Sequence, residues 1–296
     1  MGLDRSHYHP WQGRLHSPWL ATLAIVRVAL MQLFRRKIYW IVLALGLVNF
    51  LLFWTIIYIL TQLQLDENAQ KWILDRFGFS PTARAGQESG YISFMLGQNI
   101  VVGLLLPFSG SLLVGSDFQH KTLPFYLSRR IDRRHYIVGK LLAVSTIISL
   151  ITTIPALILF VEWGMFTGSL SYWMDNWRVA LSVVGFGAVI CLTLSILLVS
   201  ISAHLQKAAP IAIAWIGLFF LMAGLAELLR TFTGNNRWRL FDLWRNMRLV
   251  GRLCFDQVQN HDDRVVARQA AAILAAVCAI ALIALVRRVR AVDVVE

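Results

Sequence analysis

Long apolar stretches alternate with short polar and basic segments along the whole chain. A bilayer core about 30 Å thick needs roughly 20 mostly apolar residues per helix, and six stretches are long enough to cross it. They run over Ile38–Thr61, Ile92–Val114, Ile137–Val161, Val179–Ser202, Ala208–Leu229 and Val266–Val286. The pattern predicts an all-α polytopic membrane protein with six transmembrane helices, forming a single domain over residues 1–296.

The composition supports this fold class. Hydrophobic residues make up 57% of the chain and charged residues 15%, with a mean hydropathy of +0.62. Average globular proteins carry about 25% charged residues, so an ordinary soluble enzyme is excluded. In a membrane protein the net charge of +12 indicates topology, and we expect no nucleic-acid partner. The three cysteines give no disulfide framework and no Cys–His metal pattern.

Basic residues indicate the orientation of the spans. Sixteen of the 28 lysines and arginines fall before the first span, between spans two and three, between spans four and five, and after the last span. Because basic residues near span ends concentrate on the cytoplasmic side, both termini should be cytoplasmic. The segment Arg230–Arg268 is discordant, since it places eight basic residues on the opposite side.

The external segment 230–265 interleaves its arginines with apolar residues such as Trp238, Phe241, Trp244 and Leu249. This composition is typical of a helix that lies in the membrane interface, where arginine side chains reach the head groups. We favour this anchoring hypothesis. The alternative is an external gate that contacts a substrate.

A second interfacial helix is predicted over residues 17–37, before the first span. Ser17 followed by Pro18 is a good helix start, and apolar residues recur from Trp19 at helical spacing. The run Arg35-Arg36-Lys37 would lie near anionic head groups. We therefore expect an N-terminal amphipathic helix on the cytoplasmic leaflet.

The cytoplasmic loop 115–136 between spans two and three carries an apolar patch of Leu123, Phe125, Tyr126 and Leu127. Because no lipid covers a cytoplasmic loop, such a patch indicates either a docking site for another protein or packing against the protein's own helices. The residues alone do not separate these alternatives. We expect Arg133, Arg134 and Lys140, which follow the patch, to anchor the next span at the head groups.

At this loop the chain resembles the permease subunits of ABC-type-2 exporters, especially the group that serves nitrous-oxide-reductase maturation and copper processing. After their second span these permeases carry an acidic residue, a Gly-Thr-Leu, a Leu-Leu-Ser-like stretch, an Arg and a Gly-Lys-Leu. The corresponding places here hold Asp117, Thr122, Leu123, Leu127, Ser128, Arg133, Gly139, Lys140 and Leu141. Lys121 stands where the family has Gly, and Arg130 where it has Pro.

The resemblance implies an ABC-type-2 exporter fold and a permease that works in pairs, with an identical or paralogous second subunit. It also implies a cytoplasmic ABC ATPase partner, which would bind ATP and Mg²⁺, and the cytoplasmic (inner) membrane of a bacterium. Residues 117–128 would be the coupling helix, with Asp117 at its positive N-terminal end. The ATPase-coupling residues would be Asp117, Thr122, Leu123, Phe125, Leu127, Ser128 and Arg133.

Polar residues inside the spans are candidates for a translocation path, because hydrocarbon does not solvate them. These are Asn49, Gln98 and Asn99, which alternatively bond across helices. Glu162 and Glu227 lie near outer span ends, where we expect water to reach them. The chain has no G-x-x-x-x-G-K-[ST] motif, so we expect it to bind no nucleotide and to leave ATP hydrolysis to another chain. We also expect no bound cofactor or metal and no catalysis by this chain.

An exporter permease is therefore the favoured function. The alternatives are a membrane anchor or assembly factor that transports nothing and, less favoured, an intramembrane enzyme, for which Ser109 lacks a neighbouring base. A periplasmic or extracellular partner stays open. The transported substrate also stays open: a copper or sulfur species, a lipid, a peptide or a drug.

Overall fold

The computed structural model describes residues 18–63, 65–77, 79, 84–120, 132–168, 170–258 and 260–291, and over these residues it contains helices and no strands. The helices that build the spans are α2 (Lys37–Gln62), α4 (Arg84–Gly110), η2 (Ser111–Gly115), α5 (Ser116–Gln119), α7 (Arg133–Ile151), α8 (Thr153–Thr167), α9 (Leu170–Leu205), α10 (Ala208–Ile216), η3 (Gly217–Leu221), α11 (Met222–Thr233) and α13 (His261–Ala291). The remaining helices are α1 (Pro18–Phe34), α3 (Glu67–Phe77), η4 (Asn236–Phe241) and α12 (Leu243–Cys254).

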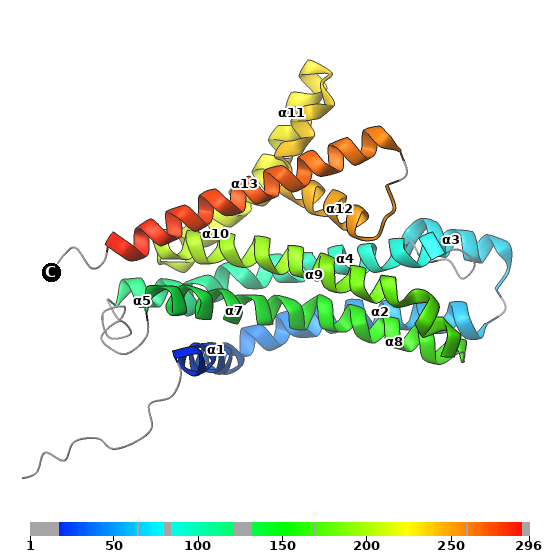
Figure 1. The fold of residues 1–296 in the computed structure, drawn as a ribbon, viewed down its shortest axis with the longest axis horizontal. Helices are drawn as coiled ribbons and strands as arrows, with labels where there is room; N and C mark the ends of the chain where they lie inside the picture. The colour runs from blue at the N-terminus through cyan, green and yellow to red at the C-terminus, as the bar shows by residue number, and fades with distance from the viewer. Residues whose placement is uncertain are drawn as a thin grey trace, which may run out of the picture.

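The six predicted spans are confirmed as helices long and apolar enough to cross a membrane. They run over Lys37–Gln62, Glu88–Gln119, Arg133–Thr167, Tyr172–Leu205, Ala208–Thr233 and His261–Arg290. Each is longer than the apolar stretch that predicts it, because the helix continues into flanking polar residues. Successive spans alternate in direction, so α3 and α12 belong to connections on one side, and α5 and α13 both end on the other side (Figure 1).

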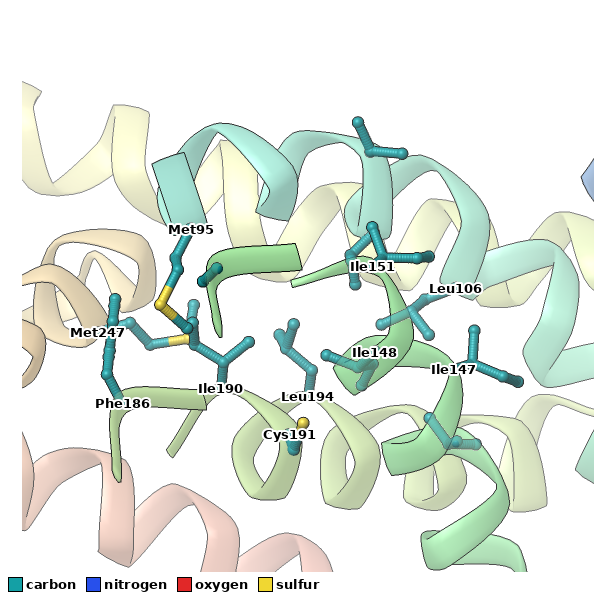
Figure 2. Packing of buried hydrophobic residues seen from close by; sticks show 14 of the residues in the cluster. Met95, Leu106, Ile147, Ile148, Ile151, Phe186, Ile190, Cys191, Leu194 and Met247 are labelled. Atoms are coloured by element: carbon teal, nitrogen blue, oxygen red, sulfur yellow. The ribbon is translucent and has the colours of Figure 1, made fainter. Parts of the chain in front are cut away.

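The spans divide into a central and a peripheral set. In the most apolar windows of the second and fourth spans 61% of the residues are buried, against 22% in the first and fifth and 17% in the sixth. Figure 2 shows the centre, where Met95, Ile148, Ile190 and Leu194 pack together with Met247 of α12. The peripheral spans therefore present apolar side chains that lipid or another protein subunit has to cover.

Two of the spans change direction along their length. The third is broken at Thr152, between α7 and α8, where Pro155 in the first turn of α8 has no backbone N–H to donate. The fifth contains a π-helical segment, η3, and beyond it α11 leaves the bundle sideways (Figure 1). Single π-helical turns within α-helices commonly mark functional positions. The departure of α11 leaves Leu225, Leu228 and Phe232 exposed.

The N-terminal helix α1 lies across the bundle and not along it. Figure 1 views α1 nearly along its own axis, while α7 and α9 run lengthwise. Ile25 of α1 packs closely on Gly139 of α7. If Gly139 were replaced by alanine, the new Cβ would lie 3.3 Å from the Ile25 side chain. Leu23 and Val28 on other faces are exposed, and Arg27 is the one charged residue from Pro18 to Phe34. A helix is thus formed over Pro18–Phe34 of the predicted range 17–37, but the expectation that it is amphipathic is wrong, because it is apolar on both faces.

Candidate functional site

The base of the loop between spans two and three holds a buried ion pair. Lys140 Nζ of α7 lies 2.7 Å from Asp117 Oδ2 of α5, and the Tyr136 hydroxyl donates a hydrogen bond of 2.8 Å to the same carboxylate oxygen. Lys140 also donates to the Leu113 carbonyl oxygen. Asp117 is 8% and Lys140 6% exposed. The pair therefore ties α5, at the end of the second span, to α7, at the start of the third.

Two expectations about this cluster are wrong. Lys140 does not anchor the third span at the head groups, because it is buried and paired with a carboxylate. Asp117 does not begin a helix, because α4, η2 and α5 form one continuous helical run that ends at Gln119. The carboxylate is stabilised there by Lys140 and Tyr136 and not by a helix N-terminus.

The other predicted coupling residues fall in two groups. Arg133 is the first residue of α7 and is exposed. It lines, with Arg134 and Arg290, a pocket of about 380 Å³ between the start of α7 and the end of α13. Thr122, Leu123, Phe125, Leu127 and Ser128 lie outside the residues that the structure describes, so their docking role stays a prediction.

Two of the three candidates for a translocation path, Asn49 and Gln98, lie at one helix contact, and Asn99 has a different environment. Gln98 donates a hydrogen bond of 2.9 Å to the Gly46 carbonyl oxygen and so joins α4 to α2. Asn49 lies against Gly97 at the same helix contact, 3.5 Å from a Cβ placed there. Asn99 is 1% exposed, and neither polar atom of its amide has a hydrogen-bond partner among the described residues. Gln98 thus makes the interhelical bond, and Asn99 keeps an unsatisfied amide inside the bundle.

The expectation that water reaches Glu162 is wrong. Its side chain in α8 is 2% exposed, and both carboxyl oxygens lack a hydrogen-bond partner within the described part of the chain. Phe160 and Trp163, its neighbours on α8, belong to a group of aromatic rings that includes Tyr91 and Tyr172. The aromatic rings therefore keep water away from Glu162 at the end of the third span. The position of Glu162 in the sequence does not reveal this burial.

The connection between spans five and six re-enters the bundle. A Cβ placed on Gly103, at the middle of the Glu88–Gln119 span, would lie 3.7 Å from Trp244 at the start of α12. Near the other end of this connection, the Gln257 amide donates a 3.0 Å hydrogen bond to Ser89, at the beginning of the same span. Helix α12 therefore runs from half the depth of the bundle to its α3 side.

The apolar face of α12 is covered by protein. Leu243, Met247 and Val250 are buried against α4, α9 and α13, and a Cβ on Gly251 would lie 2.8 Å from Phe186 of α9. The apolar stripe that suggests lipid anchoring is thus explained by packing inside the protein. The arginines of α12 lie on its opposite face.

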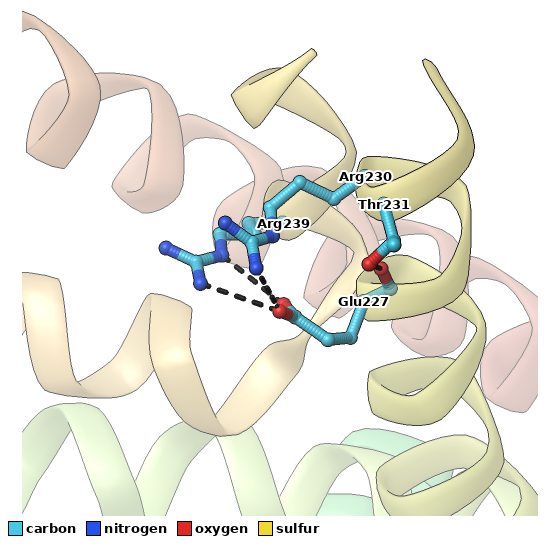
Figure 3. A network of polar contacts seen from close by, with 4 residues as sticks. All are labelled: Glu227, Arg230, Thr231 and Arg239. Carbon is cyan, nitrogen blue, oxygen red and sulfur yellow. Dashed lines mark hydrogen bonds and ion pairs between the residues drawn. The ribbon is translucent and has the colours of Figure 1, made fainter. Parts of the chain in front are cut away.

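That opposite face forms, with α11 and η4, a pocket of about 400 Å³ that we call the arginine pocket. Its lining residues are Ala223, Ala226, Glu227, Arg239, Asp242, Trp244, Arg245, Arg248, Leu249 and Arg252. Glu227 accepts from both Arg230 and Arg239, with the Nε of Arg239 at 3.2 Å (Figure 3). Asp242 caps α12 by accepting a 3.1 Å hydrogen bond from the Arg245 backbone N–H.

The charges of the arginine pocket do not balance. Glu227 and Asp242 are engaged as described, and no carboxylate of the described residues lies within 4.0 Å of Arg245, Arg248 or Arg252. The guanidinium group of arginine remains protonated in proteins. The pocket is therefore positively charged and lies beside a segment that enters the bundle.

The sequence carried a partial signal for this site. Arg245, Arg248 and Arg252 recur at the spacing of one helix face, which predicts the helix, but nothing in the spacing tells how deep the helix lies. In the comparisons with known proteins, no family model, no curated protein and no solved structure matches this chain. The candidate function of this chain therefore rests on the contacts described above and on the sequence motifs.

Proposed function

We propose that this protein is the transmembrane permease subunit of an ATP-driven ABC-type-2 exporter. A separate cytoplasmic ATPase hydrolyses ATP, and the permease couples this hydrolysis to movement of a substrate across the bacterial cytoplasmic membrane. Its termini face the cytoplasm. The chain itself performs no catalysis.

The observation that carries this proposal is the buried ion pair between Asp117 and Lys140. Both residues belong to the motif on which the resemblance rests, at its acidic and Gly-Lys-Leu positions. In the fold they meet at 2.7 Å and join the ends of the second and third spans at the base of the loop. A loop tied in this way to two spans transmits a displacement to both of them, as a coupling element requires.

The proposal includes a second permease subunit, identical or paralogous, with the translocation path between the two. Helix α11 leaves the bundle and exposes Leu225, Leu228 and Phe232, the last with 83% of its surface accessible. A second subunit would cover this surface, and one self-complementary face is enough to close such a pair. A mass measurement in detergent should give two permease subunits per complex, and a single one would contradict this part of the proposal.

The coupling role is tested by substituting Leu123→Asp. A charge forced into an apolar groove of the ATPase is expelled or buried unpaired, at a cost of several kcal/mol. We expect normal membrane insertion and loss of the ATPase from a pull-down. Leu63→Asp is the matched control, because Leu63 is exposed at the end of the first span on the opposite side and should leave ATPase recovery unchanged.

Undiminished recovery of the ATPase with Leu123→Asp would refute the coupling assignment. An anchor or assembly factor without transport is the second candidate. It is favoured if the native protein purifies without any ATP-binding subunit.

A further inference from the structure

The arginine pocket is lined by more arginines than the other cavities described, and the proposed coupling role does not use it. Five arginines surround it, counting Arg230 at its edge, against two carboxylates. Glu227 is shared between Arg230 and Arg239, and Asp242 is occupied as a helix cap. Three guanidinium groups on one face of α12 are thus left without a carboxylate.

Arg245 is half-buried and costly to keep unneutralised, while Arg248 and Arg252 continue the same helix face toward its exposed end. Trp244, which precedes them, lies at the level of the middle of the second span. Arginine this far inside a membrane protein is rare, and it faces a water-filled cavity, a partner group or a bound ligand. The guanidinium fork pairs best with carboxylate or phosphate oxygens. A phosphate group offers more oxygens and charge than one carboxylate, and so matches three arginines on one helix face better.

The size and walls of the pocket extend this argument. A volume of about 400 Å³ lies within the range of small-molecule sites and is larger than a phosphate group needs. Ala223, Ala226, Trp244 and Leu249 line the rest of the wall, and the Trp244 ring packs on Phe219 at 4.8 Å between centroids. The pocket therefore offers apolar surface directly beside its charged face.

We propose that the arginine pocket binds the phosphate group of an anionic amphiphile. Arg245, Arg248 and Arg252 hold the phosphate oxygens, and the apolar wall from α11 and α12 accommodates the adjoining hydrocarbon. The same phosphate chemistry is offered by an anionic phospholipid and by free phosphate, and the experiment separates these sources. The site does not depend on an ATPase partner, so its failure and that of the proposed function are distinguishable.

The experiment measures binding to the full-length protein, purified in detergent and stripped of lipid. The probes are dioleoyl phosphatidylglycerol, dioleoyl phosphatidylcholine and inorganic phosphate, with bound lipid counted by native mass spectrometry. We expect phosphatidylglycerol to bind at least tenfold more tightly than phosphatidylcholine. The variant Arg245→Gln/Arg248→Gln should weaken its binding at least tenfold.

The matched control is Lys71→Gln/Arg76→Gln, which removes two exposed positive charges from α3 on the same side of the protein. This control should bind phosphatidylglycerol like the unmodified protein. If the double arginine variant fails to fold, Arg252→Gln at the exposed end of the pocket provides the same comparison, with a smaller loss.

Each result of these binding measurements either supports or overturns the proposal. Loss of phosphatidylglycerol binding in the arginine variants alone supports a lipid phosphate. Binding of inorganic phosphate that the arginine variants lose, without any preference for phosphatidylglycerol, supports the phosphate site and overturns the amphiphile. Equal binding of both lipids, or equal losses in the arginine and control variants, overturns the proposal.

Discussion

Substituting Lys140→Met tests whether the ion pair at the base of the cytoplasmic loop holds two spans together. The substitution keeps an unbranched side chain of similar reach and removes the charge. Asp117 would then keep the Tyr136 hydroxyl as a donor and lose the Lys140 ammonium group at 2.7 Å. Because Asp117 is 8% exposed, water does not replace that partner fully.

The expected loss follows from the burial of both groups. Removing one partner of a buried ion pair typically destabilises a protein by about 3–5 kcal/mol, because the remaining charge is left unpaired. Removing both charges with Asp117→Asn/Lys140→Met costs far less, about 2 kcal/mol or below, because the asparagine still accepts from Tyr136. The two effects are therefore strongly non-additive, as expected for groups in direct contact.

The assay is reversible unfolding in mixed micelles with increasing sodium dodecyl sulfate, followed by circular dichroism. An exposed ion pair provides the control: Asp256 lies 3.6 Å from Arg264 with 93% of its side chain accessible. Asp256→Asn should change the free energy of unfolding by less than about 1 kcal/mol. Unfolding should begin in the region of α5 and α7 in Lys140→Met, with increased hydrogen exchange there.

Two results would refute this reasoning. A loss below about 1 kcal/mol for Lys140→Met would mean that water solvates Asp117, and the pair would not tie α5 to α7. A double variant less stable than either single variant would mean that the substitutions act through packing and not through charge.

The remaining predictions concern a close helix approach and a buried carboxyl group. Gly115→Ala should destabilise the protein by about 1–3 kcal/mol, because the new Cβ would lie 2.2 Å from the Gln206 carbonyl oxygen, a backbone atom that cannot rotate away. The control is Gly185→Ala, which has open space around it and should be neutral or stabilising in the same unfolding assay. Glu162→Met should raise the midpoint of thermal unfolding, because it replaces a buried carboxyl without hydrogen-bond partners by an apolar chain of similar length. A lowered midpoint would show that Glu162 has a stabilising partner.

The sequence determined the number and approximate limits of the spans. Inside a bilayer every backbone N–H and C=O must bond within the protein, so an apolar stretch of 20 residues becomes a helix whatever surrounds it. The helix start at Ser17 and Pro18 and the helical spacing of apolar residues predicted the helix before the first span, found over Pro18–Phe34. For the polar residues of the second span the sequence left two alternatives, and the hydrogen bond from Gln98 to Gly46 is of the interhelical kind.

Tertiary structure alone decided which of these residues are buried and what they meet. Lys140 resembles a head-group anchor and Glu162 a solvated end residue, yet both are almost fully buried by helices distant in sequence. The segment containing α12 resembles a surface anchor and instead runs alongside the middle of the second span. The physical reason is that lipid and protein interior are similarly apolar, so an apolar helix face fits either one. Only the packing of neighbouring helices decides whether such a face meets lipid or protein. The same packing sets the depth of α12, and so the surroundings in which its arginines must find a partner.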